Sequence, residues 1–124
     1  MLVLDTNILI AHLGGEEEVV QKFIAWRKDN ISLAVSSITE CEVLAYPRMR
    51  PGEEAQIEKF LNENFLAFPF DGRMARRTAR IRREIKIELA DAAIAAVALE
   101  MKASLVTRNV KDFQKIPGLE IITF

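Results

Sequence analysis

The chain alternates short apolar runs with longer segments in which apolar residues recur every three or four positions. The short runs have the length of buried strands and lie at residues 2–4, 31–35, 65–70 and 105–107, with a candidate fifth at 121–122. The longer segments have the periodicity of packed helices and lie at residues 7–13, 16–29, 38–46, 53–62 and 92–102, with an arginine-rich one after Asp71. This alternation, without a tight hairpin signal, predicts a mostly parallel sheet with right-handed crossovers in one α/β domain of residues 1–124.

Glycine, proline and capping residues mark the helix boundaries. Gly14-Gly15 divides the first two helices, and Pro47 and Pro51-Gly52 end the third. The segment Ser37-Ile38-Thr39-Glu40 has the spacing of a capping box, in which serine and glutamate side chains satisfy free N–H groups at a helix start. Asp71 is placed to cap the arginine-rich helix.

The bulk composition indicates one soluble domain. A chain of 124 residues with 50% hydrophobic and 28% charged side chains has the size of a single hydrophobic core. The N-terminus has no basic leader, and the longest apolar run, residues 89–99, is shorter than the roughly 20 residues that span a bilayer. The only cysteine, Cys41, cannot form an intramolecular disulfide and is expected to be a small buried side chain. We therefore predict a cytoplasmic protein that has no contact with a membrane.

The formal net charge of −1 conceals a basic segment. Between residues 73 and 86, the only acidic residue is Glu84, and the basic residues are Arg73, Arg76, Arg77, Arg80, Arg82, Arg83 and Lys86. Such a segment is either a solvated helix face or a contact for an anionic partner.

Asp5 is the clearest candidate for chemistry. It directly follows three apolar strand residues. A buried carboxylate without a partner is strongly destabilising unless it is protonated, hydrogen-bonded or bound to a cation. The alternative is that Asp5 caps the helix that starts at Thr6-Asn7.

Glu42 is the second candidate. Glu40 already has a role in the capping box, whereas Glu42 shares a helical face with Ile38 and Tyr46. We therefore predict that Glu42 points toward apolar surroundings, where a carboxylate requires a partner. A buried salt bridge is the alternative.

Asp91 lies in an uncharged segment, residues 89–96, where it is either a helix cap or a third inward carboxylate. Three carboxylates in one crevice repel each other, and a divalent cation removes that repulsion. Asn109 and Asp112 follow the fourth strand and offer further oxygen donors, although Asp112 could be an ordinary loop residue. Oxygen ligands without histidine or cysteine favour Mg²⁺ or Mn²⁺. The only histidine, His12, is predicted to be a surface or packing residue.

Several motifs together resemble the PIN domain family, specifically its VapC toxin type. They are Leu4-Asp5-Thr6-Asn7, Ser37-Ile38-Thr39 followed by Glu42, Asp91-Ala92-Ala93-Ile94-Ala95-Ala96, and Thr107-Arg108-Asn109 with Phe113 and Pro117-Gly118-Leu119. The resemblance implies a three-layer α/β/α fold with a four- to five-stranded, mostly parallel sheet. It also implies an endoribonuclease that depends on Mg²⁺ or Mn²⁺, is a homodimer and is inhibited by a cognate antitoxin.

The resemblance also implies residue roles. Asp5, Glu42 and Asp91 match three acidic positions of the family, and the fourth is left open between Asn109 and Asp112. Apart from the resemblance, the chemistry of a metal site leads us to expect that Thr6, Asn7 and Thr107 orient ligands or water. Because guanidinium groups bind phosphate, we also expect contacts with RNA or the partner at Arg76, Arg80, Arg83 and Arg108.

Two other classes of protein are alternatives to a nuclease. Enzymes that form an aspartyl phosphate fit poorly, because Asp5-Thr6-Asn7 lacks their second aspartate and Ser36-Ser37 stands where a receiver domain needs one. A catalytically weak or inactive module that binds nucleic acid or protein remains open, because Asn109 replaces the expected acid.

Overall fold

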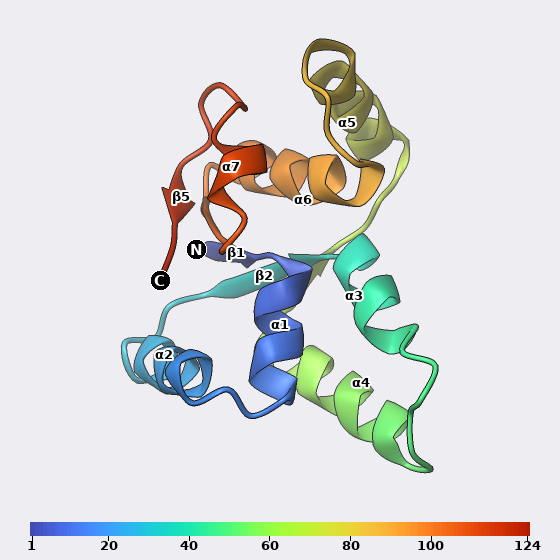
Figure 1. Ribbon diagram of the computed structural model, residues 1–124, viewed down its shortest axis with the longest axis vertical. Coiled ribbons are helices and arrows are strands. Elements are labelled where there is room, and N and C mark those ends of the chain that lie inside the picture. The colour runs from blue at the N-terminus through green and yellow to red at the C-terminus, as the bar shows by residue number, and fades with distance from the viewer.

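A parallel sheet divides the molecule into two helical halves, as Figure 1 shows for the computed structural model of residues 1–124. The elements in chain order are β1 (Leu2–Leu4), α1 (Thr6–Leu13), α2 (Glu17–Lys28), β2 (Leu33–Ser36), α3 (Ser37–Leu44), α4 (Glu53–Asn64), β3 (Leu66–Phe68), α5 (Gly72–Glu84), α6 (Leu89–Glu100), β4 (Ser104–Val106), α7 (Val110–Phe113) and β5 (Ile121–Ile122). All strands expected from the apolar runs are present.

The five strands lie in the order β3-β2-β1-β4-β5, and every neighbouring pair is parallel. The chain builds outward from β1 through β2 to β3, then returns to the other side of β1 for β4 and β5. In the central register, Leu2 lies opposite Leu33 of β2 and Ser104 of β4. The predicted mostly parallel sheet is therefore confirmed.

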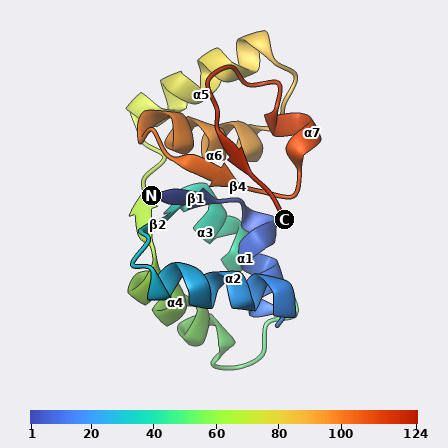
Figure 2. The same ribbon diagram turned by 90° about the vertical axis from the view of Figure 1, so that its left-hand side faces the viewer.

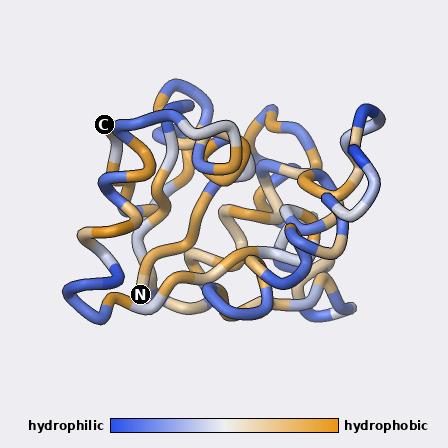
Figure 3. Tube along the Cα trace, turned by 90° about the horizontal axis from the view of Figure 1, so that it is seen from below, coloured by the Kyte–Doolittle hydropathy of each residue, from blue (hydrophilic) through white to orange (hydrophobic).

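Alternation along the strands produces two cores, one on each face of the sheet. Leu4 and Val35 belong to the core beneath α1, α2 and α4, whereas Val3 and Ala34 belong to the core beneath α5 and α6. Figure 2 shows the resulting layers, with the sheet between the two groups of helices. In Figure 3 many of the segments inside the molecule are apolar, and the hydrophilic positions gather toward the outer turns. The three-layer α/β/α arrangement is therefore confirmed.

The helix boundaries agree with the sequence at some points and differ at others. The Gly14-Gly15 break is confirmed, since α1 ends at Leu13 and Gly15 has a φ of 77°. Asp71 caps α5 through a 3.0 Å bond from the Met74 N–H to its Oδ1. The capping box is wrong by one residue, because Ser36 caps α3 by accepting the Ile38 N–H at 3.1 Å.

Two further differences bear on the acidic residues. The alanine-rich helix α6 begins at Leu89 instead of residue 92, so Asp91 lies inside its first turn. Short helix α7 follows β4 where the sequence predicted no helix, and it includes Asp112. No helix in the chain combines the length and the apolar character that a membrane span requires.

Candidate functional site

The strand order reverses between β1 and β4, and ligands of parallel α/β sheets bind beyond the carboxyl ends of strands at such a point. Asp5 follows β1 directly, and Thr107 follows β4. Their side chains meet, since the Thr107 hydroxyl donates to Oδ2 of Asp5 at 2.7 Å. The structure therefore brings Asp5 and Thr107 together at this edge of the sheet.

The Asp5 carboxylate is almost entirely buried, with 4% of the residue exposed. Burial raises the pKa of this carboxyl above its ordinary value, against hydrogen bonds from the Thr107 hydroxyl and the Thr6 backbone N–H that lower it. Asp5 occupies the N-cap position of α1, yet its side chain accepts no capping hydrogen bond from the second or third N–H of the helix. The capping alternative is therefore wrong, and the carboxylate is directed toward β4.

Glu42 reaches the same region from α3, which packs against both α1 and α6 (Figure 1). The Thr6 hydroxyl donates to Oε1 of Glu42 at 2.6 Å and lies 3.1 Å from the Thr39 hydroxyl. The prediction that Glu42 is inward-facing is wrong, because the residue is exposed. The buried face of α3 consists of Thr39 and Val43, one turn apart, and Glu42 lies at its edge.

Asp91 is half-buried in the first turn of α6. Burial raises the pKa of its carboxyl to about 6, and surrounding negative charges add to the rise. Those charges belong, in decreasing order, to Asp5, Glu42, Asp112 and Glu88. The carboxylates predicted from separate parts of the sequence therefore act on one another electrostatically in the fold.

Asn109 and Asp112 are linked to Asp5 through Thr107. The Asn109 amide donates to Oδ2 of Asp112 at 3.0 Å, and the Asn109 backbone N–H donates to the Thr107 hydroxyl at 2.9 Å. The Thr107 hydroxyl thus accepts from one neighbour while it donates to Asp5. Asp112 contributes negative charge to the pocket, and Asn109 holds it in position.

We call the region around Asp5, Glu42, Asp91 and Asp112 the acidic pocket. None of these four carboxylates takes part in an ion pair. No group of three or more His, Cys, Asp or Glu side chains lies close enough together to hold a metal ion by itself. Mg²⁺ is commonly bound through one or two carboxylates and several waters, so four acids around a pocket need not converge on one point.

A family model described as PIN domain matches residues 2–119. The chain belongs to the PIN domain family. It is 30% identical to ribonuclease VapC19 of Mycobacterium tuberculosis, over 97% of this chain and 98% of that protein. It is 31% identical to ribonuclease VapC1 of Rickettsia felis, over 98% and 95% of the two chains.

Solved structures agree with this assignment. A toxin–antitoxin complex from Klebsiella pneumoniae contains a chain that matches with a TM-score of 0.83 and 34% identity, over 99% of this chain and 97% of that one. VapBC2 from Rickettsia felis, bound to a DNA fragment from its promoter, matches with a TM-score of 0.84 over 99% and 98% of the chains. At 23% identity, the second likeness shows the PIN fold alone.

The other residues predicted for this PIN domain lie around the pocket or away from it. Asn7 is exposed at the start of α1. Arg108 follows Thr107, but its guanidinium donates to Glu16 at 3.0 Å and lies 5.3 Å from the Phe124 ring centroid. Arg108 is therefore engaged within the chain, and a contact with RNA or a partner would have to share it.

The three arginines predicted to contact RNA or a partner, Arg76, Arg80 and Arg83, are exposed on α5. None of them forms an ion pair. They are therefore free to contact an anion, and that role stays a prediction.

Three further side chains lie beside the pocket, in the core and on the surface. Thr39 was missed as a site residue, although it belongs to the Ser37-Ile38-Thr39 motif and its buried hydroxyl contacts Thr6. His12 has the predicted packing role, stacked at 4.1 Å from Phe23 between ring centroids. The prediction that Cys41 is buried is wrong, because it lies on the exposed side of α3.

Proposed function

We propose that this protein is an endoribonuclease that uses Mg²⁺ or Mn²⁺ held by the acidic pocket. The observation that carries the proposal is that Asp5, Glu42 and Asp112 lie near enough to Asp91 to add to the rise that burial causes in its pKa, while none of the four carboxylates has a basic partner. A fold retains such repulsion when a function requires it, and a divalent cation would relieve it. The relatives named ribonucleases supply the reaction class.

The donor chemistry of the pocket fits a hard cation. Asp5 and Asp91 are the proposed direct ligands, with Glu42 and Asp112 as further ligands or as acceptors for bound water. When bound, the cation would activate water as the nucleophile and stabilise the charge that develops on the phosphate. The pKa of Asp91 is about 6, so most of this carboxyl is ionised at neutral pH. Binding of the cation would release the proton from the remaining fraction.

The threonines of the pocket have positioning roles in this proposal. The Thr107 hydroxyl fixes the orientation of Asp5, and the Thr6 hydroxyl fixes that of Glu42. Each donor is neutral, so it orients a carboxylate without neutralising the charge that the cation needs.

Cleavage of a labelled single-stranded RNA tests the proposal. We expect cleavage by the wild type with MgCl₂ or MnCl₂, none in EDTA, and none by Asp91→Asn. The matched control is Asp29→Asn, the same substitution at an exposed residue after α2, which should cleave like the wild type. Cation-independent cleavage, or full activity of Asp91→Asn, would contradict the proposal.

The binding-module alternative rests on the observation that no three acidic groups are close enough to hold an ion by themselves. It predicts a wild type that binds RNA or a protein, does not cleave RNA, and is not stabilised by MgCl₂ in a thermal melt. The same RNA assay, combined with that melt, therefore separates the two functions.

We also propose that the chain is the toxin of a toxin–antitoxin pair and a homodimer. The matching Klebsiella structure is a toxin–antitoxin complex. A groove of about 500 Å³ between α1, α3 and α4 is lined by exposed apolar residues, including Ile10 and Tyr46, and reaches Glu42. An apolar antitoxin segment in this groove would cover the edge of the acidic pocket. Replacement of Ile10 by Asp should abolish inhibition of RNA cleavage by the antitoxin. Light scattering of the purified protein would test the homodimer separately.

A further inference from the structure

The arginine-rich helix α5 has three sides with different environments. On one side, Arg73 and Arg77 share one partner, Glu100 of α6, which offsets part of their positive charge and fixes both guanidinium groups against α6. On the outer side, Arg76 and Arg80 face solvent. The remaining basic residues of this segment are Arg82, Arg83 and Lys86.

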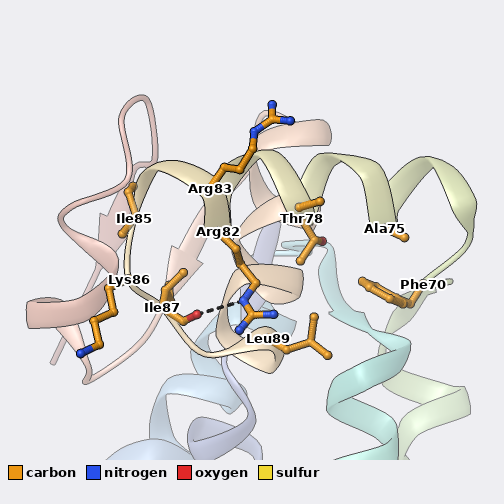
Figure 4. Close-up of a pocket in the computed structure, with 10 residues that line it drawn as sticks. Phe70, Ala75, Thr78, Arg82, Arg83, Ile85, Lys86, Ile87 and Leu89 are labelled. Atoms are coloured by element: carbon orange, nitrogen blue, oxygen red, sulfur yellow. Dashed lines mark hydrogen bonds between the residues drawn. The ribbon is translucent and has the colours of Figure 1, made fainter.

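That third side of α5 borders an open groove, shown in Figure 4. We call it the α5 groove, and its volume is about 670 Å³. Ala75, Thr78, Ala79, Arg82 and Lys86 line it from α5 and just beyond, at the three- and four-residue spacing of one helical side, and Arg83 also borders it. Small side chains at 75 and 79 leave the space, and the basic residues lie toward one end.

The groove combines fixed positive charge with an apolar floor. The Arg82 Nε–H donates to the Ile87 carbonyl at 3.2 Å, which orients the guanidinium and leaves its outer N–H groups free (Figure 4). Phe70 and Leu89 line the floor, and 48% of Leu89 is exposed. No acidic residue lines the groove. Single-stranded nucleic acid matches this surface, because each nucleotide carries both a phosphate for the basic end and a flat base for the apolar floor.

The floor of the groove is connected to the helices that carry the acidic pocket. The Phe70 backbone N–H donates to the Ser37 hydroxyl at 2.9 Å, at the start of α3, which bears Glu42. Leu89 begins α6 two residues before Asp91. The α5 groove therefore borders the first turns of the two helices, α3 and α6, that carry Glu42 and Asp91.

We propose that the α5 groove binds a single-stranded RNA segment beside the phosphate to be cleaved. Arg82 and Lys86 contact backbone phosphates, and an unstacked base lies against Phe70 and Leu89. The inference rests on the proposed function and adds to it a binding surface for the substrate, the α5 groove.

Fluorescence anisotropy with a labelled, unstructured 12-nucleotide RNA in EDTA tests binding without cleavage. The double variant Arg82→Gln/Lys86→Gln should bind about tenfold or more weakly, and its slope of log affinity against log salt should fall by about 1.4, for two lost contacts. The control Arg27→Gln/Lys28→Gln removes the same charge from two exposed residues of α2, on the other face of the sheet, and should keep the wild-type slope. Ala79→Phe fills the groove at an exposed position without changing charge, and it should also weaken binding about tenfold.

The outcomes separate this inference from the proposed function. If the two double variants lose RNA affinity equally, or if Ala79→Phe binds RNA like the wild type, the groove is not the RNA-binding surface. Cleavage by the wild type would be unaffected by either result. A wild type that neither binds nor cleaves RNA would overturn both. Loss of self-association or of a protein partner, with RNA binding unchanged, would assign the groove to that contact and reject the RNA role.

Discussion

Replacing Asp91 by Asn should stabilise the cation-free protein while abolishing its proposed activity. The carboxyl of Asp91 is half-buried, and its pKa is raised first by burial and then by Asp5, Glu42, Asp112 and Glu88. Asn has nearly the same shape and no charge. The substitution therefore removes repulsion from the pocket and leaves the packing of α6 almost unchanged.

The size of the gain follows from two opposing effects of the lost charge. An ordinary aspartate has a pKa of 3.8 and Asp91 one of about 6; at about 1.4 kcal/mol per pH unit, the difference is equivalent to about 3 kcal/mol. Solvent screening at this partly exposed carboxyl reduces it to about 1–2 kcal/mol. Loss of a favourable negative charge in the first helical turn subtracts about 0.3–1 kcal/mol. The relief of burial and repulsion outweighs this loss, so the net gain in the free energy of unfolding is about 1 kcal/mol.

The gain must depend on pH in one direction. Because the pKa of Asp91 is higher in the folded state, the folded protein holds the proton more tightly, and stability is lost as pH rises from about 4 to above 6. Asn does not titrate. The difference between variant and wild type should therefore be largest at pH 8 and fall to about a third of that value at pH 4.5.

Urea denaturation followed by circular dichroism in EDTA, at pH 4.5, 6 and 8, measures this difference. Asp29→Asn is again the control and should show no pH-dependent gain. In MgCl₂ the order should reverse, because cation binding adds about 2.7 kcal/mol to the wild type at 100 times Kd and much less to the variant. A variant that is less stable than the wild type at pH 8 in EDTA would refute the electrostatic reasoning.

Three further substitutions, one of them with a matched control, test the fold by urea denaturation. Thr107→Val removes the hydroxyl bound to buried Asp5 and should cost about 2–3 kcal/mol, whereas Thr78→Val loses one intrahelical bond and should cost about 1 kcal/mol or less; equal costs would contradict the assigned role. Phe23→Ala removes the centre of an aromatic cluster and should lower the free energy of unfolding by about 3–5 kcal/mol. A loss below about 1 kcal/mol would show that the cluster does not act as a core. Ala95→Leu overfills the space between α6 and the sheet and should cost about 1–3 kcal/mol or more, and an unchanged midpoint would argue against close packing there.

The fold was largely predictable because burial on both faces of a parallel sheet leaves a plain trace in the sequence. Runs such as Leu2–Leu4 are short, apolar and followed by a polar residue, and all of them became strands. The strand order could not be read from these runs. It follows from which faces of the helices cover the sheet, a tertiary property that no local pattern contains.

The site was predictable to the extent that chain position fixes it. Asp5 and Thr107 end neighbouring parallel strands, so strand geometry alone brings them together. Glu42 was assigned to the pocket by an argument that failed, since its residue is exposed and the buried face of α3 holds Thr39. The positions of residues around a helix do not show which edge of its buried face meets a neighbouring helix. Here α1 packs against α3, and this contact places Glu42 beside Thr6.

The choice of hydrogen-bond partners explains how the pocket keeps its charge. A buried carboxylate is usually satisfied by a basic side chain, and this chain has 17 lysines and arginines. Arg108 adjoins the pocket in sequence, yet it pairs with Glu16, while Asp5 receives the hydroxyl of Thr107. A neutral donor satisfies the oxygen and lowers its desolvation penalty without cancelling the negative potential. Replacing Thr107 by Lys would therefore place an ammonium where we propose a cation, so the protein should become less dependent on MgCl₂ for stability and should lose RNA cleavage.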